Sequence, residues 1–393
     1  MTTRDIEKRN CGQMMRKINM ADPHFGEEDR VWIHREIDAV LDGSLSMGPN
    51  VQAFEREFAT RVGVRHAIAM NSCTAALEAA LLSRDIVGRE VIVPAETFIA
   101  TGMAVHLAGA RPVFAEISEA TLCLDLEDVK RKVTANTVGV ILVHMAGLIT
   151  PDILEFRRFC DANRLFLIED AAHSPGARHA GREAGSFGHA GCFSFFPTKV
   201  ITAGEGGMLT TDDDEIAAYA RSYQHRGRDM QAPVERYVLP GRNVRMTEMA
   251  ALLGRVQFSH LDEFLAQRRR IAAIYGQALA GLAQVRLLLP ATLESSSFWK
   301  APLLLDRSID RVSIAERMAA AGVAVDWAYQ PALHLQPVFR DLYGTAEGLL
   351  PKTEDILSRH LCLPCHPRMT GEDAVYVANT LRDAVSAVAG AAQ

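Results

Sequence analysis

Two patterns of hydrophobic and polar positions follow one another along the chain. From about residue 66 to residue 170, short runs of apolar and β-branched residues alternate with stretches that have the periodicity of amphipathic helices. Short apolar runs are typical of strands buried on both faces, and helical connections are what neighbouring parallel strands require. The pattern therefore predicts an α/β fold in which a mainly parallel sheet is flanked by helices.

The individual elements of this region are bounded by changes in the pattern. Two helices are expected first, at 27–41 and 51–60. Strands are then expected at 67–70, 91–93, 112–115, 138–143 and 165–168, and helices at 75–82, 99–108, 126–132 and 153–163. After Gly241 the pattern changes to a long helix over 246–282 with a break near His260, followed by a strand at 299–304 and helices at 313–320 and 371–387. We therefore expect an N-terminal arm (1–24), a large domain (25–275) and a smaller α+β C-terminal domain (276–393).

Composition excludes several classes of protein. With 393 residues, 48% hydrophobic and 23% charged residues, the chain has the composition of a globular protein long enough for two domains. A net charge of −6 leaves no basic surface for nucleic acid or membrane. The longest apolar stretch, 138–149, is interrupted by His144 and is too short to span a bilayer. The polar N-terminal segment has no secretory pattern, so a cytoplasmic protein is expected, and no metal site is predicted.

The seven cysteines do not form the pattern of a disulfide framework. One segment, Cys362-Leu363-Pro364-Cys365-His366, formally matches both a CxxC redox pair and a haem-attachment motif. Its position near the C-terminus, in a chain with no visible export signal, disfavours both functions. Two partly buried cysteines in a strand-to-loop segment are the preferred interpretation.

Lys199 is the most informative residue of the chain. The sequence has seven lysines against thirty-five arginines, and Lys199 alone follows an aromatic, strand-like run and precedes a glycine-rich segment at 204–207. Poor solvation between buried strands lowers the pKa of a lysine and frees its amine to attack carbonyl groups. Upstream, the predicted strand at 165–168 ends in Glu169 and Asp170, where the strands of α/β sheets deliver functional groups. A lysine that can hold an aldehyde and an acid that can hold a pyridinium nitrogen indicate pyridoxal phosphate (PLP).

Three further features are compatible with this cofactor, although each has a structural alternative. The segment 71–76 follows a strand and opens an alanine-rich helix, where free amides bind phosphate, or where Ser72 and Thr74 simply cap the helix. His173 could contact the phenolic oxygen of the ring or be a structural histidine. Phe98 could stack on the ring or belong to the core. Asp170 itself could cap the following turn. No glycine-rich dinucleotide motif and no Walker A sequence occurs, which disfavours nicotinamide and ATP.

Taken together, these segments resemble a known family. Ile168-Glu169-Asp170-Ala171-Ala172-His173, Phe193-Ser194-Phe195-Phe196-Pro197-Thr198-Lys199 and Gly204-Glu205-Gly206-Gly207 are similar to the motifs of DegT/StrS-type sugar aminotransferases, which are PLP enzymes of fold type I. The similarity extends over about residues 25–385. A sister group that performs dehydration carries histidine in place of the lysine, so the lysine here argues for transamination.

The resemblance implies roles for individual residues. It implies that Lys199 carries the cofactor and moves the proton, that Asp170 holds the pyridinium nitrogen, and that His173 contacts the ring oxygen. Ser194 and the Thr74–Ala75 turn are expected to hold the phosphate. Asn243 is expected to reach the cofactor phosphate of a neighbouring subunit, which implies a homodimer with shared sites. Cys73 departs from the family pattern, which usually has glycine at this position.

The resemblance also implies a reaction. We expect a ping-pong aminotransferase that takes an amino group from L-glutamate or glutamine and gives it to a nucleotide-diphosphate-linked keto-deoxy sugar, or alternatively to a keto-cyclitol. Arg242, Arg245 and His334 are candidates for binding the acceptor, although the arginines could instead cover the surface or a dimer interface. The remaining alternatives are a non-catalytic PLP-binding regulatory protein and a different fold-type-I enzyme such as a β-lyase.

Overall fold

A seven-stranded sheet forms the centre of the computed structural model, which describes residues 16–391. Neighbouring strands from β8 to β3 pair in parallel, whereas β9 pairs antiparallel with both β8 and β1. The order across the sheet is β1 (His66–Met70), β9 (Gly207–Thr211), β8 (Ala190–Ser194), β5 (Phe166–Asp170), β4 (Thr137–Val143), β2 (Glu90–Pro94) and β3 (Arg111–Ala115). The predicted α/β class with a mainly parallel sheet is confirmed. The antiparallel strand β9 was not predicted.

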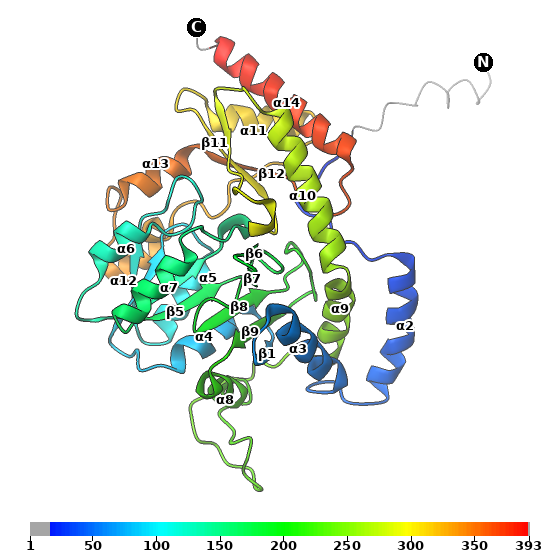
Figure 1. The fold of residues 1–393 in the computed structure, drawn as a ribbon, viewed down its shortest axis with the longest axis vertical. Helices are drawn as coiled ribbons and strands as arrows, with labels where there is room; N and C mark the ends of the chain where they lie inside the picture. The colour runs from blue at the N-terminus through cyan, green and yellow to red at the C-terminus, as the bar shows by residue number, and fades with distance from the viewer. Residues whose placement is uncertain (1–15, 392–393) are drawn as a thin grey trace, which may run out of the picture.

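Helices cover both faces of this sheet (Figure 1). Successive side chains of a strand point to opposite faces, so Ala67 and Ala69 of β1 pack into one core while Ile68 and Met70 pack into the other. The first core includes residues of α3 (Pro49–Val62), α6 (Leu126–Lys132) and α7 (Ile153–Ala162), and the second includes residues of α4 (Cys73–Leu82), α5 (Ile99–Leu107) and α8 (Asp214–Tyr223). The apolar runs of the sequence are continuous because these strands are buried on both sides.

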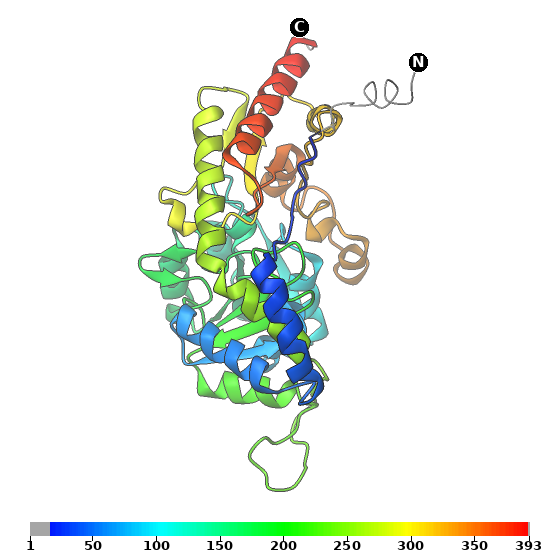
Figure 2. The ribbon, with the colours of Figure 1, turned by 90° about the vertical axis from the view of Figure 1, so that its right-hand side faces the viewer.

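A smaller antiparallel sheet lies beyond the long helical segment. Its strands are β10 (Val285–Leu287), β11 (Ala301–Leu305) and β12 (His360–Leu363). They share a core with α10 (Leu261–Ala278), α11 (Arg311–Ala320) and α14 (Gly371–Ala391), and α10 and α14 lie side by side in Figures 1 and 2. The helix predicted to break near His260 is two helices, because His260 ends α9 (Glu248–Ser259) and precedes α10.

The segments at the two ends of the chain refine the expected division. Of the expected arm, residues 1–15 lie outside the described residues, while Ile18 pairs with Val323 of the small domain and is buried. α2 (Glu27–Leu41) packs against α9. Residue 275 lies in the last turn of α10, and we propose this helix as the connection between the domains. Two helices of the expected small domain, α12 (Pro337–Tyr343) and α13 (Pro351–Arg359), pack against the region of the large sheet. The ring centroid of Phe339, in α12, lies 5.1 Å from that of Phe114, in β3.

The motif at 362–366 belongs to the interior of the small domain. Cys362 lies in β12 and Cys365 follows it, and both thiols are free and buried. Burial raises the pKa of each thiol to about 12, so neither is a reactive thiolate. Within residues 16–391 no helix combines the length and apolar character needed to cross a bilayer. The remaining short strands are β6 (Arg178–His179) and β7 (Arg182–Glu183), which form a two-stranded sheet.

Candidate functional site

A cavity of about 500 Å³ opens where the large sheet meets the small domain. The carboxyl ends of β5 and β8, the N-terminus of α4 and the start of α5 form its large-domain wall, and residues near β11 form the other wall. Ligand sites in open α/β sheets lie at the carboxyl ends of the strands. The charged residues that line this cavity are Asp170, Lys199, Glu205 and Lys300.

Asp170 reaches the cavity because it is the last residue of β5 and points to the face covered by α4 and α5. Its Oδ2 atom accepts a hydrogen bond from Thr101 Oγ1 at 2.8 Å, and its Oδ1 atom accepts one from the amide of Ala172 at 3.2 Å. Burial raises the pKa of Asp170, although these two hydrogen bonds and the charge of Lys199 act in the opposite direction. A buried carboxylate with few donors is well suited to a cationic ligand, such as a protonated pyridine nitrogen.

Lys199 lies in the loop that follows β8 and points into the same cavity. Its backbone amide donates to the carbonyl of Phe196 at 2.9 Å, which fixes the turn. Burial lowers the pKa of Lys199 to about 8, and the positive charge of Lys300 adds to the effect, whereas Asp170 and Cys73 oppose it. A lysine with this pKa is partly neutral near physiological pH and can act as a nucleophile or a base.

Three rings form the wall beside Lys199. His173 stacks on Trp299 with ring centroids 3.9 Å apart, and its Nε2 atom is 2.8 Å from the hydroxyl of Tyr329. Burial lowers the pKa of His173 well below its usual value, so this histidine is neutral. The indole N–H of Trp299 donates to the carbonyl of Thr198 at 2.6 Å and thereby joins the small domain to the lysine loop. At the rim, Phe98 is 54% exposed with its ring centroid 5.7 Å from that of Tyr329.

The N-terminus of α4 forms the polar end of the cavity. Ser72 caps the helix, because its Oγ atom accepts a hydrogen bond from the amide of Ala75 at 3.2 Å. The amides of Cys73 and Thr74 have no hydrogen-bond partner among the described residues, so they are free to bind a phosphate group. Gly207 allows β9 to pass close by, since a Cβ atom there would lie 2.3 Å from the carbonyl carbon of Ser72. Of the residues expected to hold the phosphate, Thr74 and Ser194 line the cavity, whereas the amide of Ala75 is already used.

The expected residues of the 242–245 segment lie outside the cavity. Asn243 is exposed, and the neighbouring carbonyl of Val244 accepts a hydrogen bond from the amide of Asn71 at 2.8 Å, which places the segment beside the N-terminus of α4. Arg242 Nε is 3.1 Å from Glu78 Oε2. The side chain of Arg245 contacts a histidine, with its Nη1 atom 3.0 Å from Nδ1 of His225.

His334 is not brought to the cavity. It is fully buried, and its Nε2 atom lies 2.9 Å from Oε1 of Glu354. The cavity is also lined by residues that were not singled out from the sequence, among them Thr101, Trp299, Lys300 and Tyr329. Thr101 lies in the first turn of α5 on the side that faces Asp170, and its hydroxyl is 2.8 Å from that of Thr97, which precedes the helix.

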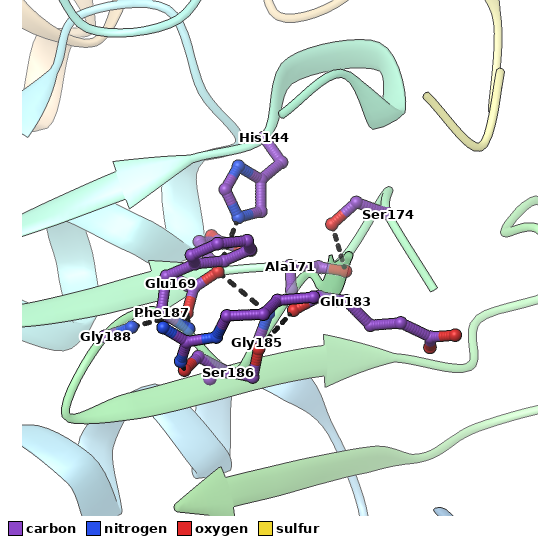
Figure 3. Close-up of polar contacts among 12 residues, drawn as sticks. His144, Glu169, Ala171, Ser174, Glu183, Gly185, Ser186, Phe187 and Gly188 are labelled. Atoms are coloured by element: carbon purple, nitrogen blue, oxygen red, sulfur yellow. Dashed lines mark hydrogen bonds and ion pairs between the residues drawn. The ribbon is translucent and has the colours of Figure 1, made fainter. Parts of the chain in front are cut away.

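Because successive side chains of a strand alternate between its faces, Glu169, the neighbour of Asp170, points to the opposite face of the sheet. Figure 3 shows its carboxylate among His144 and the residues of 185–188. Its carboxylate accepts hydrogen bonds from the amides of Gly185, Phe187 and Gly188 at 2.8, 2.6 and 2.6 Å. The ring of His144 completes the set, with Nε2 2.8 Å from Oε2. These contacts tie the loop at 185–188 to β5 and thereby fix the strand end that carries Asp170.

Comparisons with known proteins agree with this arrangement. The model of the DegT/DnrJ/EryC1/StrS aminotransferase family matches residues 28–382. GDP-perosamine synthase of Caulobacter vibrioides is 34% identical over 91% of this chain and 95% of its own. The dTDP-3-amino-3,4,6-trideoxy-alpha-D-glucose transaminase of Streptomyces venezuelae is 33% identical over 91% of this chain and 93% of its own. The structure of DesI, solved in the presence of its TDP-sugar product, superimposes with a TM-score of 0.85 and 32% identity, covering 96% of this chain and 95% of that one.

Proposed function

Because the chain belongs to the DegT/DnrJ/EryC1/StrS aminotransferase family, we propose that it moves an amino group from L-glutamate or glutamine to a keto sugar linked to a nucleoside diphosphate. The chain is a PLP-dependent aminotransferase, as its family and its relatives are. The donor, the acceptor and the order of the two half-reactions are the proposed part. The single observation that carries the proposal is the presence in one cavity of Lys199, whose pKa is lowered to about 8, and the under-satisfied carboxyl of Asp170.

The residues of the cavity fit PLP. The free amides of Cys73 and Thr74, together with Ser194, would hold the phosphate, and Asp170 would hold the ring nitrogen in its protonated form. When bound, PLP withdraws electrons from the carbon that carries the amino group. Lys199 supplies the amine that holds the cofactor between turnovers.

The chain's own groups then perform the proton transfers. Lys199, once released from the cofactor, removes the proton from the Cα atom of the donor, which its lowered pKa allows near neutral pH. In the second half-reaction the same lysine delivers a proton to the acceptor carbon that receives the amine. Neutral His173, held by Tyr329 and stacked on Trp299, would orient the ring of PLP without adding a positive charge. Because both substrates need Lys199 and one cavity, a ping-pong order is the simplest mechanism.

The nature of the acceptor is supported by the names of the relatives. The Caulobacter and Streptomyces proteins are named for GDP-linked and dTDP-linked amino sugars. Their similarity to this chain extends over nine-tenths of its length. Arg242 and Arg245 lie outside the cavity and close to the N-terminus of α4, where they are candidates for contacts to a diphosphate. A keto-cyclitol has no diphosphate for these arginines to bind.

We further propose that the active unit is a homodimer. The rim of the cavity exposes Phe98 and also Phe196, which is 43% exposed, so the site is open on this side. The segment between α8 and α9 projects from the molecule in both views and exposes Met230 and Tyr237 (Figures 1 and 2). Asn243 lies in the same segment, exposed and beside the phosphate end. A second copy that covers these apolar residues could bring its own Asn243 to this cavity.

An absorption experiment tests the proposal. The purified protein loaded with PLP is expected to absorb near the edge of the visible range because the cofactor is bound to Lys199, and Lys199→Ala should lack this band. Adding L-glutamate or glutamine should shift the band into the ultraviolet as the cofactor takes up the amine, and an NDP-linked keto sugar should restore it. A band that neither amino acid shifts would contradict the proposed donor. Restoration by keto-cyclitols but not by nucleotide sugars would contradict the proposed acceptor.

A further inference from the structure

The cavity contains a second lysine, Lys300, which comes from the small domain just before β11. Its Nζ atom is 2.6 Å from Oδ2 of Asp326 and 4.2 Å from the ring centroid of Trp299. The Nζ atom of Lys199 is 4.5 Å from the same centroid. The two ammonium groups are therefore arranged around one indole, close to the position where a substrate must react.

We propose that Lys300 is the carboxylate-binding residue for the amino donor. The inference rests on the proposed function, because it assigns to this side chain the recognition of an acidic donor at the same site. Lys300 binds a carboxylate oxygen of the donor while Lys199 acts on its Cα atom. It is thus a specificity-determining residue of the first half-reaction.

The charges of the cavity support this role. L-glutamate brings two carboxylates into the site, and a buried carboxylate requires a positive partner. Among the described residues that line the cavity, only Lys199 and Lys300 are positively charged, and no arginine is present. Lys199 is committed to the cofactor and to proton transfer, which leaves Lys300 as the available cation within the described cavity.

The geometry of Lys300 leaves room for a ligand. An ammonium group has three N–H donors, and in the described structure the Nζ atom of Lys300 has one hydrogen-bond partner, Asp326. Its side chain is only 11% exposed, so water screens an ion pair there much less than at the surface. Asp326 fixes the ammonium group and does not itself line the cavity. The lysine is therefore preorganised, and binding a carboxylate requires little further loss of side-chain entropy.

Two other roles for Lys300 predict different results. If the Lys300–Asp326 pair only joined β11 to the segment at 326, removing either partner would have the same effect on stability and no specific effect on carboxylates. If Lys300 bound the diphosphate of the acceptor, its loss would weaken binding of pyrophosphate and leave dicarboxylates unaffected. The experiment must therefore compare these anions and both members of the pair.

The test measures binding of glutarate to the PLP-loaded protein by calorimetry, because this dicarboxylate has no amine and cannot react. Lys300→Met is expected to weaken glutarate binding by roughly ten- to a hundredfold, the loss of a charge-assisted hydrogen bond in a desolvated site. Lys300→Arg should retain most of the affinity. Asp326→Asn should bind glutarate as tightly as the wild type or more tightly, since it frees the ammonium group. The matched control is Lys352→Met, because Lys352 forms a similar ion pair with Asp125, 2.6 Å away, outside the cavity.

The half-reaction gives an independent readout. Lys300→Met should raise the L-glutamate concentration needed for half-maximal conversion of the cofactor, while its PLP absorption band and melting temperature stay those of the wild type. Should Lys300→Met prove unstable, Lys300→Gln, which is shorter but keeps a polar end group, serves in its place. Equal glutarate affinity in Lys300→Met and the wild type would overturn the inference, as would a loss confined to pyrophosphate. Failure of the wild type to react with L-glutamate would instead contradict the proposed function, and the glutarate measurement does not depend on that reaction.

Discussion

Glu169 and Asp170 are consecutive residues of β5, yet their carboxylates lie in very different surroundings. Glu169 is fully buried and meets three backbone amides and the ring of His144 (Figure 3). Asp170 is also buried, but within residues 16–391 it accepts hydrogen bonds from only Thr101 and the amide of Ala172, with the thiol of Cys73 more distant at 3.9 Å. One strand therefore delivers a carboxylate satisfied by the fold and a carboxylate left for a ligand.

The number of partners that the fold gives to a buried carboxylate distinguishes a structural role from a ligand-binding role. A buried charge is costly unless donors or opposite charges surround it, so complete satisfaction by the fold indicates a structural role. A buried carboxyl that faces a cavity with few donors and a raised pKa lacks a partner that only a ligand can supply. The alternation of side chains along a strand places the two roles back to back.

Asp170→Asn should reduce activity more than any other substitution considered for these two carboxylates. An amide cannot keep the ring nitrogen of PLP protonated, so we expect the rate of amino transfer to fall by roughly a thousandfold. The same substitution should leave the stability of the protein unchanged or increase it. The pKa of Asp170 in the folded, cofactor-free protein is raised, so the carboxyl lowers stability as pH rises through and above its unfolded pKa. Asparagine does not ionise, and at pH 8 the cofactor-free variant should melt at the same temperature as the wild type or a higher one.

Glu169→Gln should lower the stability of the protein, in contrast to Asp170→Asn. Glutamine keeps one acceptor oxygen, but its NH₂ group must face backbone amides that are themselves donors. We expect the free energy of unfolding to fall by about 2–5 kcal/mol, measured by chemical denaturation of the cofactor-free protein. Glu57→Gln is the control, because Glu57 is 41% exposed in its pair with Arg255 and should contribute about 0–1 kcal/mol. A loss no larger than that of the control would contradict a structural role for Glu169.

The sequence predicted the large-domain wall of the site better than the other wall. Asp170, His173 and Lys199 could be found because each lies at or shortly after the end of a strand whose apolar run is unmistakable, and parallel strands end at the same edge. Trp299 and Lys300 come from a segment a hundred residues further on, and only tertiary packing brings them to the cavity. No local signal distinguishes a tryptophan beside a strand from an ordinary core residue.

Two further differences from expectation have similar causes. His334 was a candidate for binding the acceptor, but its partner Glu354 lies twenty residues further along the chain and holds it in the interior. The strand β9 begins at Gly207, the last glycine of the glycine-rich segment 204–207, and glycine is unfavourable in strands. Here Gly207 is needed because any side chain would collide with Ser72.

The titration of Lys199 in the cofactor-free protein reports on the charge of Asp170. Its amine should react with formaldehyde and a mild reductant with a midpoint near pH 8, because only the neutral form is nucleophilic. The charge of Asp170 raises the pKa of Lys199, so Asp170→Asn should move the midpoint to lower pH. Glu57→Gln should leave it in place. Mass spectrometry of the peptide that contains Lys199, at a series of pH values, measures this midpoint, and one that Asp170→Asn does not move would disprove the coupling.

A more modest effect is expected at Thr101, whose hydroxyl donates a hydrogen bond to Asp170. Thr101→Val preserves shape but removes the donor at 2.8 Å, and since that hydrogen bond lowers the pKa of Asp170, its loss should raise this pKa further. A protonated Asp170 cannot hold a protonated ring nitrogen, so the low-pH limit of activity should move to higher pH, with a loss of roughly two- to tenfold at neutral pH. Thr60→Val, on α3, makes the same replacement far from the cavity and should leave the pH profile unchanged. An unaltered low-pH limit in Thr101→Val would mean that the hydrogen bond from Thr101 does not influence the pKa of Asp170.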